Sequence, residues 1–408
     1  MPNNQSETIT DLSDELLFLI ACCQTEATKE DENFIYTYLN DESLDLNTLI
    51  RLANQHGIFP LVYKSIMNLS KSHASLEQFL PDLKSVYSQI ARRNMLMSAE
   101  LIRIMKLLKD NDIEALAFKG PALAKMAYGD ITLRQYGDLD ILVDEKDLYQ
   151  AAALIVDQNY EPMDSIEFLK NSAKIHVEKN YEFYGRKNGI KVEIHWRLIN
   201  SSFLKKFKNY NVFSTQDTVH INNTPLPTLD TKILLLYLCN HGASHMWERL
   251  EWIVDIDKLV RVEGTSLNWD TIMILAASLQ SKITLLLGLG LSKALFHTKL
   301  PPEIESQLNS AQISNLVSFV LQTFDSDLIT KDHTSHEKNF KVFQFNLALQ
   351  DSLLTKARFI LHTLFDYSDR DVMSINLPKP LFFLYYPIRI LRIINKYTLI
   401  PLKRLFIK

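Results

Sequence analysis

Apolar residues recur at helical spacing through the first hundred positions of the chain. One apolar stripe opens at Leu16, a second opens at Leu49, and a third runs through residues 84–108 before a polar connection at 109–112. This spacing gathers the apolar side chains on one side of a helix. We therefore expect a helical N-terminal module over residues 1–95.

The pattern changes in the segment that follows. Residues 113–118 form a short apolar run suited to a buried strand, Lys119-Gly120-Pro121 suits a turn, and residues 122–128 are strong helix formers. Proline is well placed at the first position of a helix, because its missing N–H has no helical partner there. The segment therefore predicts a strand, a turn and a helix in succession.

Acidic and apolar residues alternate in residues 137–143, a pattern typical of a strand. Side chains alternate between the two faces of a strand, so Asp138 and Asp140 share one face while Leu139 and Ile141 lie on the other. The alternation therefore predicts two carboxylates side by side. Two solvated acids at a strand end would give the same local pattern.

A later segment, residues 189–198, alternates in the same way and places Glu193, His195 and Arg197 on its polar face. Carboxylates this close repel and raise each other's pKa unless a divalent cation neutralises them. Magnesium prefers carboxylate oxygens and is commonly shared with substrate phosphates. The pattern favours a Mg²⁺ site, with Mn²⁺ as the alternative ion.

Composition narrows the class of protein. The chain has 408 residues, of which 47% are hydrophobic and 23% charged, as in globular proteins. Its three cysteines are too few for a disulfide framework or a zinc site and favour a reducing compartment. Residues 1–15 are polar and acidic, and no apolar run reaches about 20 residues. We expect a cytoplasmic protein, and the net charge of −4 argues against nucleic acid as a partner.

Helical stripes dominate from residue 231 onward, with no repeat of fixed period. We expect an α+β protein with a small mixed-sheet core over residues 96–227 and a helical C-terminal domain over residues 228–371. That helical domain would close a cleft over the core.

Residues 372–408 form a basic aromatic tail, because no acid follows Asp371. Such a tail could lie on an anionic membrane surface as a peripheral contact. The alternative, which we favour slightly, is a C-terminal helix that packs on the preceding bundle. The basic residues of the tail are Lys379, Arg389, Arg392, Lys396, Lys403, Arg404 and Lys408.

Four motifs together resemble the uncharacterised nucleotidyltransferase family of the polymerase-beta-like superfamily. They are LAFKGPALAKMAYGD, LRQYGDLDILV, KVEIHWRL and HGASHMWERLEWIVDIDKL, and the resemblance spans about residues 49–260. It implies that Asp138 and Asp140 bind metal, that Glu193 completes an acidic triad, and that Gly120 approaches the phosphates of a nucleotide. The implied reaction transfers a nucleoside monophosphate from an NTP, with ATP the expected donor, and releases pyrophosphate.

The turn before the predicted helix departs from the superfamily pattern. The usual Gly-Ser or Gly-Gly is replaced by Lys119-Gly120-Pro121, and the spacer to the acids is longer. Lys119 or Arg134 could supply the positive charge that phosphates need. We therefore list Lys119, Gly120 and Arg134 as candidate nucleotide-binding residues.

Further side chains are candidates for substrate contact. His195 and Arg197 are as well explained by an ordinary strand surface as by a role in binding. His241 and Trp247 lie in a segment that the resemblance makes a wall of the cleft, where they could touch nucleotide or acceptor. Trp247 and Trp252 are equally typical of a helical core.

The motifs do not identify the acceptor. It could be a small molecule, a sugar, a peptide or a protein, and it would react through a hydroxyl or a phosphate. The main alternative to an enzyme is a noncatalytic nucleotide-binding or scaffold protein that retains the fold. A nucleic-acid-modifying transferase is a third hypothesis, but it would need a basic stripe beside the cleft.

Overall fold

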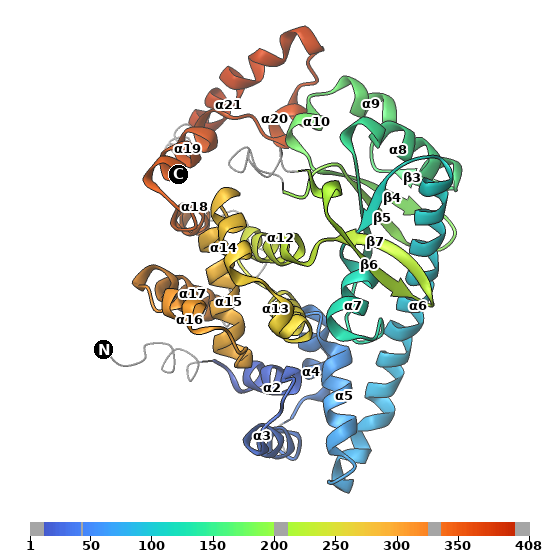
Figure 1. Ribbon diagram of the computed structural model, residues 1–408, viewed down its shortest axis with the longest axis vertical. Helices are drawn as coiled ribbons and strands as arrows, with labels where there is room; N and C mark the ends of the chain where they lie inside the picture. Colours follow the sequence, from blue (N-terminus) through green and yellow to red (C-terminus); the bar gives the residue numbers. More distant parts are fainter. Residues whose placement is uncertain (1–11, 42–43, 200–210, 325–335, 396–408) are drawn as a thin grey trace, which may run out of the picture.

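The computed structural model describes residues 12–41, 44–199, 211–324 and 336–395. Its N-terminal part is helical, as the apolar stripes predict (Figure 1). The elements are α2 (Asp14–Cys23), α3 (Lys29–Leu39), α4 (Leu46–Gln55), α5 (Phe59–Leu69), the 3-10 helix η1 (Ala74–Phe79) and α6 (Leu80–Asp110).

Helix α6 joins the N-terminal helices to the sheet. It has 31 residues, and in Figure 1 it runs along one side of the molecule from the helical end to the sheet. Leu83 is buried among the N-terminal helices, whereas Leu101 and Ile104 are buried in the core of the sheet domain. The boundary expected at residue 95 therefore falls inside one continuous helix.

Five strands form a mixed sheet in the order β1-β2-β5-β4-β3. Strands β2 and β5 are parallel, and the other neighbouring pairs are antiparallel. A small mixed sheet between helical regions is an α+β architecture, so the predicted fold class is confirmed. The strands are β1 (Ala115–Ala117), β2 (Asp138–Val143), β3 (Tyr160–Pro162), β4 (Asn180–Gly185) and β5 (Lys191–His195).

Apolar side chains on the central strands explain how the sheet is anchored. Leu139 and Ile141 of β2 and Val192 and Ile194 of β5 are completely buried in one core with α6 and α8. A separate two-stranded hairpin, β6 with β7, follows the sheet. The other elements of this part are α7 (Gly120–Tyr128), η2 (Glu145–Asp147), α8 (Leu148–Asp157), α9 (Ile166–Asn171), α10 (Lys174–Val177), η4 (Val212–Ser214), β6 (Gln216–Ile221) and β7 (Thr224–Leu229).

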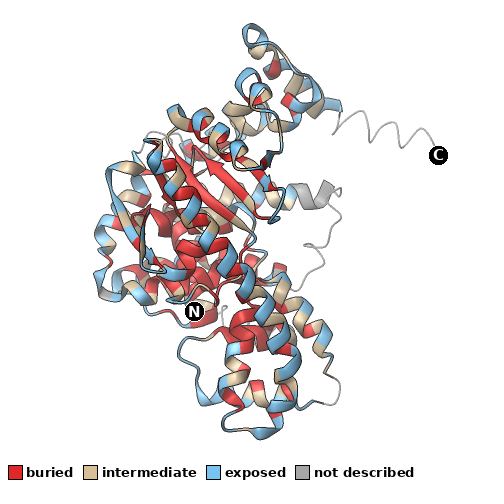
Figure 2. Cartoon of the chain, turned by 90° about the vertical axis from the view of Figure 1, so that its right-hand side faces the viewer, coloured by how far each residue is buried: buried red, intermediate tan, exposed pale blue. Residues whose placement is uncertain are grey.

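A bundle of helices follows, as predicted from residue 231 onward. Helix α15 lies at its centre, where every residue from Thr284 to Leu291 is buried. In Figure 2 the strands of the sheet are mostly red, which shows that the sheet is buried. The helices are α12 (Thr231–Ser244), α13 (Leu250–Glu263), η5 (Gly264–Ser266), α14 (Trp269–Ser278), α15 (Lys282–Phe296), α16 (Pro302–Leu308) and α17 (Ala311–Phe324).

The last described segment packs against the rest of the molecule at a few points. Tyr385 is completely buried in a small cluster with Ala173 and Val372, which matches the packed-helix alternative for this part of the tail. The elements are α18 (His336–Ala348), α19 (Leu353–Phe365), α20 (Asp369–Ser374), η7 (Lys379–Leu384) and α21 (Tyr385–Ile394). Four basic residues of the predicted tail lie outside the described residues: Lys396, Lys403, Arg404 and Lys408. Among the described helices, none combines the length and hydropathy that a bilayer crossing requires.

Candidate active site

The parallel pairing of β2 with β5 brings the predicted acids together. In the register of this pair, Asp140 lies opposite Glu193 and Asp138 lies opposite Lys191. Residues opposite each other on neighbouring strands share a face of the sheet, so the side chains meet. The strand of Glu193 therefore lies directly beside the strand of the two aspartates.

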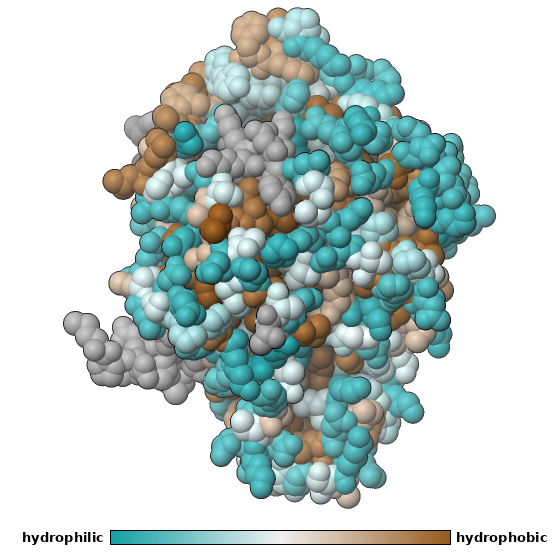
Figure 3. All heavy atoms as spheres, in the orientation of Figure 1, coloured by the Kyte–Doolittle hydropathy of each residue, from teal (hydrophilic) through white to brown (hydrophobic). Residues whose placement is uncertain are grey.

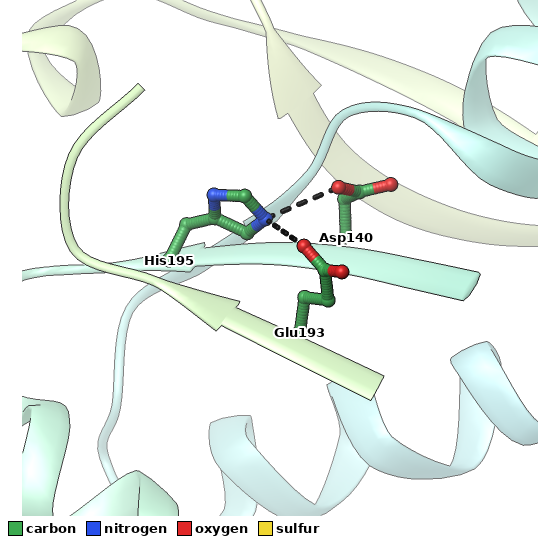
Figure 4. A group of neighbouring side chains, drawn as sticks. All are labelled: Asp140, Glu193 and His195. Carbon is green, nitrogen blue, oxygen red and sulfur yellow. Dashed lines mark hydrogen bonds and ion pairs between the residues drawn. The ribbon is translucent and has the colours of Figure 1, made fainter. Parts of the chain in front are cut away.

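Three side chains converge most closely. Asp140, Glu193 and His195 each offer one ligand atom, and these atoms lie within 4.8 Å of one another. Figure 4 shows His195 Nε2 between the two carboxylates, 3.1 Å from Asp140 Oδ1 and 3.2 Å from Glu193 Oε2. Asp138 lies two residues before Asp140 on the same strand and is not part of this closest group.

Lysine side chains offset the negative charge of the acids. Lys119 Nζ lies 3.2 Å from Asp140 Oδ1, and Lys191 pairs with Glu193 on the other side. Asn180 Nδ2 also donates a hydrogen bond of 2.7 Å to Glu193 Oε2. The site is thus a buried mixture of carboxylates and cations.

The pKa values of the carboxylates are driven apart by their surroundings. Burial, followed by the negative charge of Asp140, raises the pKa of Asp138 to about 6. Burial acts in the same direction on Asp140, but the Lys119 ammonium and the hydrogen bond from His195 outweigh it and hold the pKa of Asp140 well below its usual range. The same balance, led by burial against His195, lowers the pKa of Glu193 to about 2.

Lys119 stays charged despite its surroundings. Burial opposes the charge, but the carboxylate of Asp140 outweighs burial and raises the pKa of Lys119 above its usual value. An ammonium group is therefore fixed beside the acids. A fixed ammonium at this place suits the phosphates that a bound nucleotide would bring.

One carboxylate oxygen among these acids is suited to bind a cation. Asp140 Oδ2 is buried and has no hydrogen-bond partner among the described residues. A buried carboxylate oxygen without a partner is costly, and a divalent cation would remove that cost. With carboxylate and imidazole donors converging beside it, Asp140, Glu193 and His195 fit a divalent metal ion such as Mg²⁺ or Mn²⁺.

The turn before α7 sets the position of Lys119. Gly120 has φ +49°, and a Cβ at this position would lie 3.1 Å from the carbonyl oxygen of Asp138. Glycine therefore lets the turn lie directly against β2. The residue before it, Lys119, then reaches Asp140, while the amide of Ala122 is already occupied by the carbonyl of Lys119 at 3.1 Å.

Two predicted arginines are bonded away from the acids. Arg134 is buried and donates from Nε and Nη2, both at 2.8 Å, to the two oxygens of Asp255 on α13. Arg197 donates to Glu145 at 3.2 Å and to the carbonyl of His176 at 3.3 Å. The structure therefore does not bring either guanidinium to the carboxylates.

Helix α12 brings the other predicted segment to the site. The His241 ring lies 5.8 Å from the ring of Tyr237 and nearly parallel to it, and the Tyr237 ring lies 6.0 Å from Lys119 Nζ. Trp247 is completely buried, and its ring fills the space above Gly242. His241 is therefore near the acids, whereas Trp247 is part of the core.

Tyr237 is a residue that the sequence analysis missed. Its neighbours from Ile233 to Leu238 are apolar, so the local pattern indicates only a buried helix face. The signal that could have found it is its spacing of four residues from His241, which places both rings on one side of the helix.

A model of the family described as "Uncharacterised nucleotidyltransferase" matches residues 42–297. Among solved structures, the antibiotic-resistance factor ANT(2'')-Ia is 11% identical, with a TM-score of 0.33 over 46% of this chain and 94% of that chain. An antigenic nucleotidyltransferase-like protein from Paracoccidioides brasiliensis is 14% identical, with a TM-score of 0.33 over 51% of this chain and 93% of that chain. These structural likenesses are too distant to carry an argument. A comparison with curated proteins found no match.

Proposed function

The chain belongs to the uncharacterised nucleotidyltransferase family, and from that premise we propose that it is a metal-dependent enzyme that transfers a nucleoside monophosphate from an NTP to an acceptor. The observation that carries the proposal is the pairing of Asp140 with Glu193 across β2 and β5. Asp138, on the same strand, adds a third carboxylate. Together with the unpartnered Oδ2 of Asp140, this arrangement supports metal-assisted transfer.

Each residue of the site has its own role in the proposed reaction. Asp138, Asp140 and Glu193, with His195 at their side, would hold the metal, which would supply charge stabilisation for the phosphates and the departing pyrophosphate. Lys119 would bind phosphate oxygens through its ammonium. Gly120 would let the backbone at the start of α7 approach them. Arg134 would not contact the phosphates directly, because its guanidinium is paired with Asp255.

The bond changes follow from this placement. The acceptor oxygen forms a bond to the α-phosphorus, and the bond from that phosphorus to the bridging oxygen of the β-phosphate breaks. Pyrophosphate leaves with the electron pair of the broken bond. For a hydroxyl acceptor, the proton passes to solvent, because the lowered pKa of Glu193 makes its carboxylate a weak base; a phosphate acceptor has already lost the proton.

We place the enzyme in the cytoplasm with ATP as the first donor to test. All three cysteines, Cys22, Cys23 and Cys239, are free and buried, which suits a reducing compartment. The acceptor is a small molecule, a sugar, a peptide or a protein that offers a hydroxyl or a phosphate. A nucleic acid is the least suited acceptor, given the net charge of −4.

A peripheral membrane contact through the C-terminal part is a separate element of the proposal. Exposed apolar side chains gather on α19 and α21, including Leu361 at 55% and Leu391 at 66% exposure, and brown residues appear at the upper left edge in Figure 3. Arg392 forms an ion pair with Asp371, so less positive charge is available to bind anionic lipids. Flotation with anionic liposomes, comparing the full chain with one ending near Asp371, tests this contact; equal flotation would remove it.

The main test uses labelled NTPs. Wild-type protein and the Asp138→Asn/Asp140→Asn variant are incubated with Mg²⁺, each labelled NTP and a cell extract. We expect a labelled product that the double variant forms at least about a hundred-fold more slowly, because the charge stabilisation at the phosphates is lost. Absence of any acid-dependent product would favour the noncatalytic scaffold.

A second test addresses the phosphate contact. Lys119→Ala should weaken binding of the NTP by about ten-fold or more, because an ammonium beside the phosphates is lost. Circular dichroism checks that the variant is folded. Unchanged NTP affinity in a folded variant would rule out this role for Lys119.

A further inference from the structure

A row of aromatic and imidazole rings leads away from the acids along α12. The row consists of Tyr237, His241 and His245 of α12 and Trp252 of α13, and we call it the α12 wall. The His241 ring lies 4.9 Å from His245 and 5.3 Å from Trp252. His245 in turn lies 5.2 Å from Trp252, which is 8% exposed, so the four rings form one chain of contacts.

The inner end of the α12 wall reaches the candidate metal group. Phe118 lies 5.1 Å from the His195 ring and 5.1 Å from the Tyr237 ring, edge to face in both cases. On the other side, Tyr237 lies beside Lys119, whose ammonium contacts Asp140. The wall therefore begins where the phosphates of a nucleotide would bind.

The outer end of the wall opens to solvent. Tyr237 is 1% exposed, His241 is partly exposed, and His245 is exposed. Since Tyr237, His241 and His245 are spaced by four residues, they follow one side of the helix over about 12 Å. Arg249 lies over Trp252, 6.0 Å from its ring, at this outer end. A nucleotide extended from the metal group has a comparable length.

Two polar atoms on the wall lack partners. Tyr237 Oη and His241 Nδ1 are buried without a hydrogen-bond partner among the described residues. Folded proteins satisfy nearly all such groups, so each of these two atoms needs an explanation. Nucleobases carry both donors and acceptors at their edges and would satisfy them.

The electrostatic state of the wall suits a neutral ring. Burial, followed by the charge of Lys119, lowers the pKa of His241 well below its usual value, and burial also lowers the pKa of His245. Both imidazoles are therefore neutral near pH 7. Neutral imidazole and indole rings stack well on the planar faces of bases.

A metal site at the two histidines explains the wall less well. His241 and His245 have helix spacing that allows both to bind one ion. Among the described residues, however, no third acid, cysteine or histidine converges with them, whereas one converges at Asp140. The pair also makes ring contacts with Trp252, which is typical of a stacking surface.

We propose that the α12 wall is the nucleobase subsite of the enzyme, with the base of the NTP lying against His241, His245 and Trp252 while its phosphates lie at Lys119. This inference rests on the proposed function. It assigns Trp252 and His245 a role in binding, and it gives the helical domain a direct part in donor selection.

The test separates the base from the phosphates. Calorimetry with Mg²⁺ measures the Kd of the tightest-binding of the four NTPs and of inorganic tripolyphosphate, which has no base. We expect His245→Ala and Trp252→Leu each to weaken NTP binding about ten-fold and to change tripolyphosphate binding less than two-fold. Lys119→Ala should weaken both ligands, and Glu248→Gln, an exposed neighbour on the same turn, should weaken neither.

The outcomes distinguish this inference from the proposed function. Wild-type protein that binds none of the four NTPs would overturn the proposed function, and the inference with it. NTP binding that both wall variants leave unchanged would overturn the inference alone, as would equal losses for NTP and tripolyphosphate. His245 is exposed, so His245→Ala keeps the test decisive if Trp252→Leu disturbs packing.

Discussion

Asp140 and Asp255 are both buried carboxylates, yet their surroundings differ in one respect. Both oxygens of Asp255 are occupied: Oδ1 accepts from Arg134 Nε and from Tyr128 Oη, and Oδ2 accepts from Arg134 Nη2. Only Oδ1 of Asp140 is occupied, by Lys119 and His195, while its Oδ2 has no partner among the described residues.

The difference separates a structural ion pair from a site prepared for a ligand. The pair of Arg134 and Asp255 joins the loop before β2 to α13, so it fixes the helical bundle to the sheet. Among the acids at β2 and β5, by contrast, Oδ2 of Asp140 has no hydrogen-bond partner among the described residues, and the pKa of Asp138 is raised. A satisfied buried charge holds the fold together, whereas an unsatisfied one indicates function.

The largest expected effect comes from breaking the structural pair. Arg134→Met leaves the carboxylate of Asp255 buried without its guanidinium, and we expect a loss of about 3–5 kcal/mol in the free energy of unfolding. Urea unfolding measures it. Lys106→Met removes an exposed pair with Asp110 and should cost at most about 1 kcal/mol. Equal losses would show that Asp255 is not a structural partner of the kind described.

Mg²⁺ should stabilise the protein through the acids. At about ten times the Kd of the ion, linkage predicts a gain of about 1.4 kcal/mol in the free energy of unfolding. The Asp138→Asn/Asp140→Asn variant should show no gain. Thermal unfolding with and without Mg²⁺ measures both proteins, and an equal gain in the double variant would place the ion elsewhere.

Asp138→Asn alone should stabilise the metal-free protein. The pKa of Asp138 is raised to about 6, so its ionised form is less stable in the folded state than in the unfolded chain. Removing the charge should add roughly 1 kcal/mol at pH 7, after a discount for partial exposure. Glu114→Gln, an exposed acid beside β1, should change stability by less than about 0.5 kcal/mol. A lower free energy of unfolding for Asp138→Asn than for wild type would contradict the unfavourable effect of burial and of the Asp140 charge on ionised Asp138.

The smallest effect is the pH dependence of that gain. A raised carboxyl pKa means that the folded state binds a proton more tightly than the unfolded chain, so stability rises as pH falls through about 6. The advantage of Asp138→Asn over wild type should therefore shrink between pH 7 and pH 5. Urea unfolding with EDTA at several pH values tests this. A stability advantage of Asp138→Asn that grows toward pH 5 would contradict a raised pKa of Asp138 in the folded state.

Local pattern predicted much of the fold. Periodic apolar spacing gave the N-terminal helices and the long run that is α6, and proline after Gly120 marked the start of α7. Alternation along residues 137–143 placed Asp138 and Asp140 on one face of β2. These features depend on neighbours in the chain, and the sequence shows such neighbours directly.

The remaining features depend on partners far apart in the sequence. Arg134 bonds to Asp255 121 residues later, so its proximity to the acids in the chain suggested phosphate instead. The short strands β3 and β4 and the hairpin of β6 with β7 carry weak alternation and escaped prediction. Tyr237 looked like one more apolar position of a helix. Its closeness to Lys119 follows only from the way α12 packs on the sheet domain.

Binding of Mn²⁺, followed by electron paramagnetic resonance, measures whether the acids of β2 and β5 hold a metal ion. Wild-type, Asp140→Asn and Asp255→Asn proteins are titrated with Mn²⁺ and compared per mole of folded protein. We expect a Mn²⁺ site that Asp140→Asn loses and Asp255→Asn retains, because of these two carboxylates only that of Asp140 has an oxygen free for a metal. Equal Mn²⁺ affinity in wild-type and Asp140→Asn proteins would contradict it.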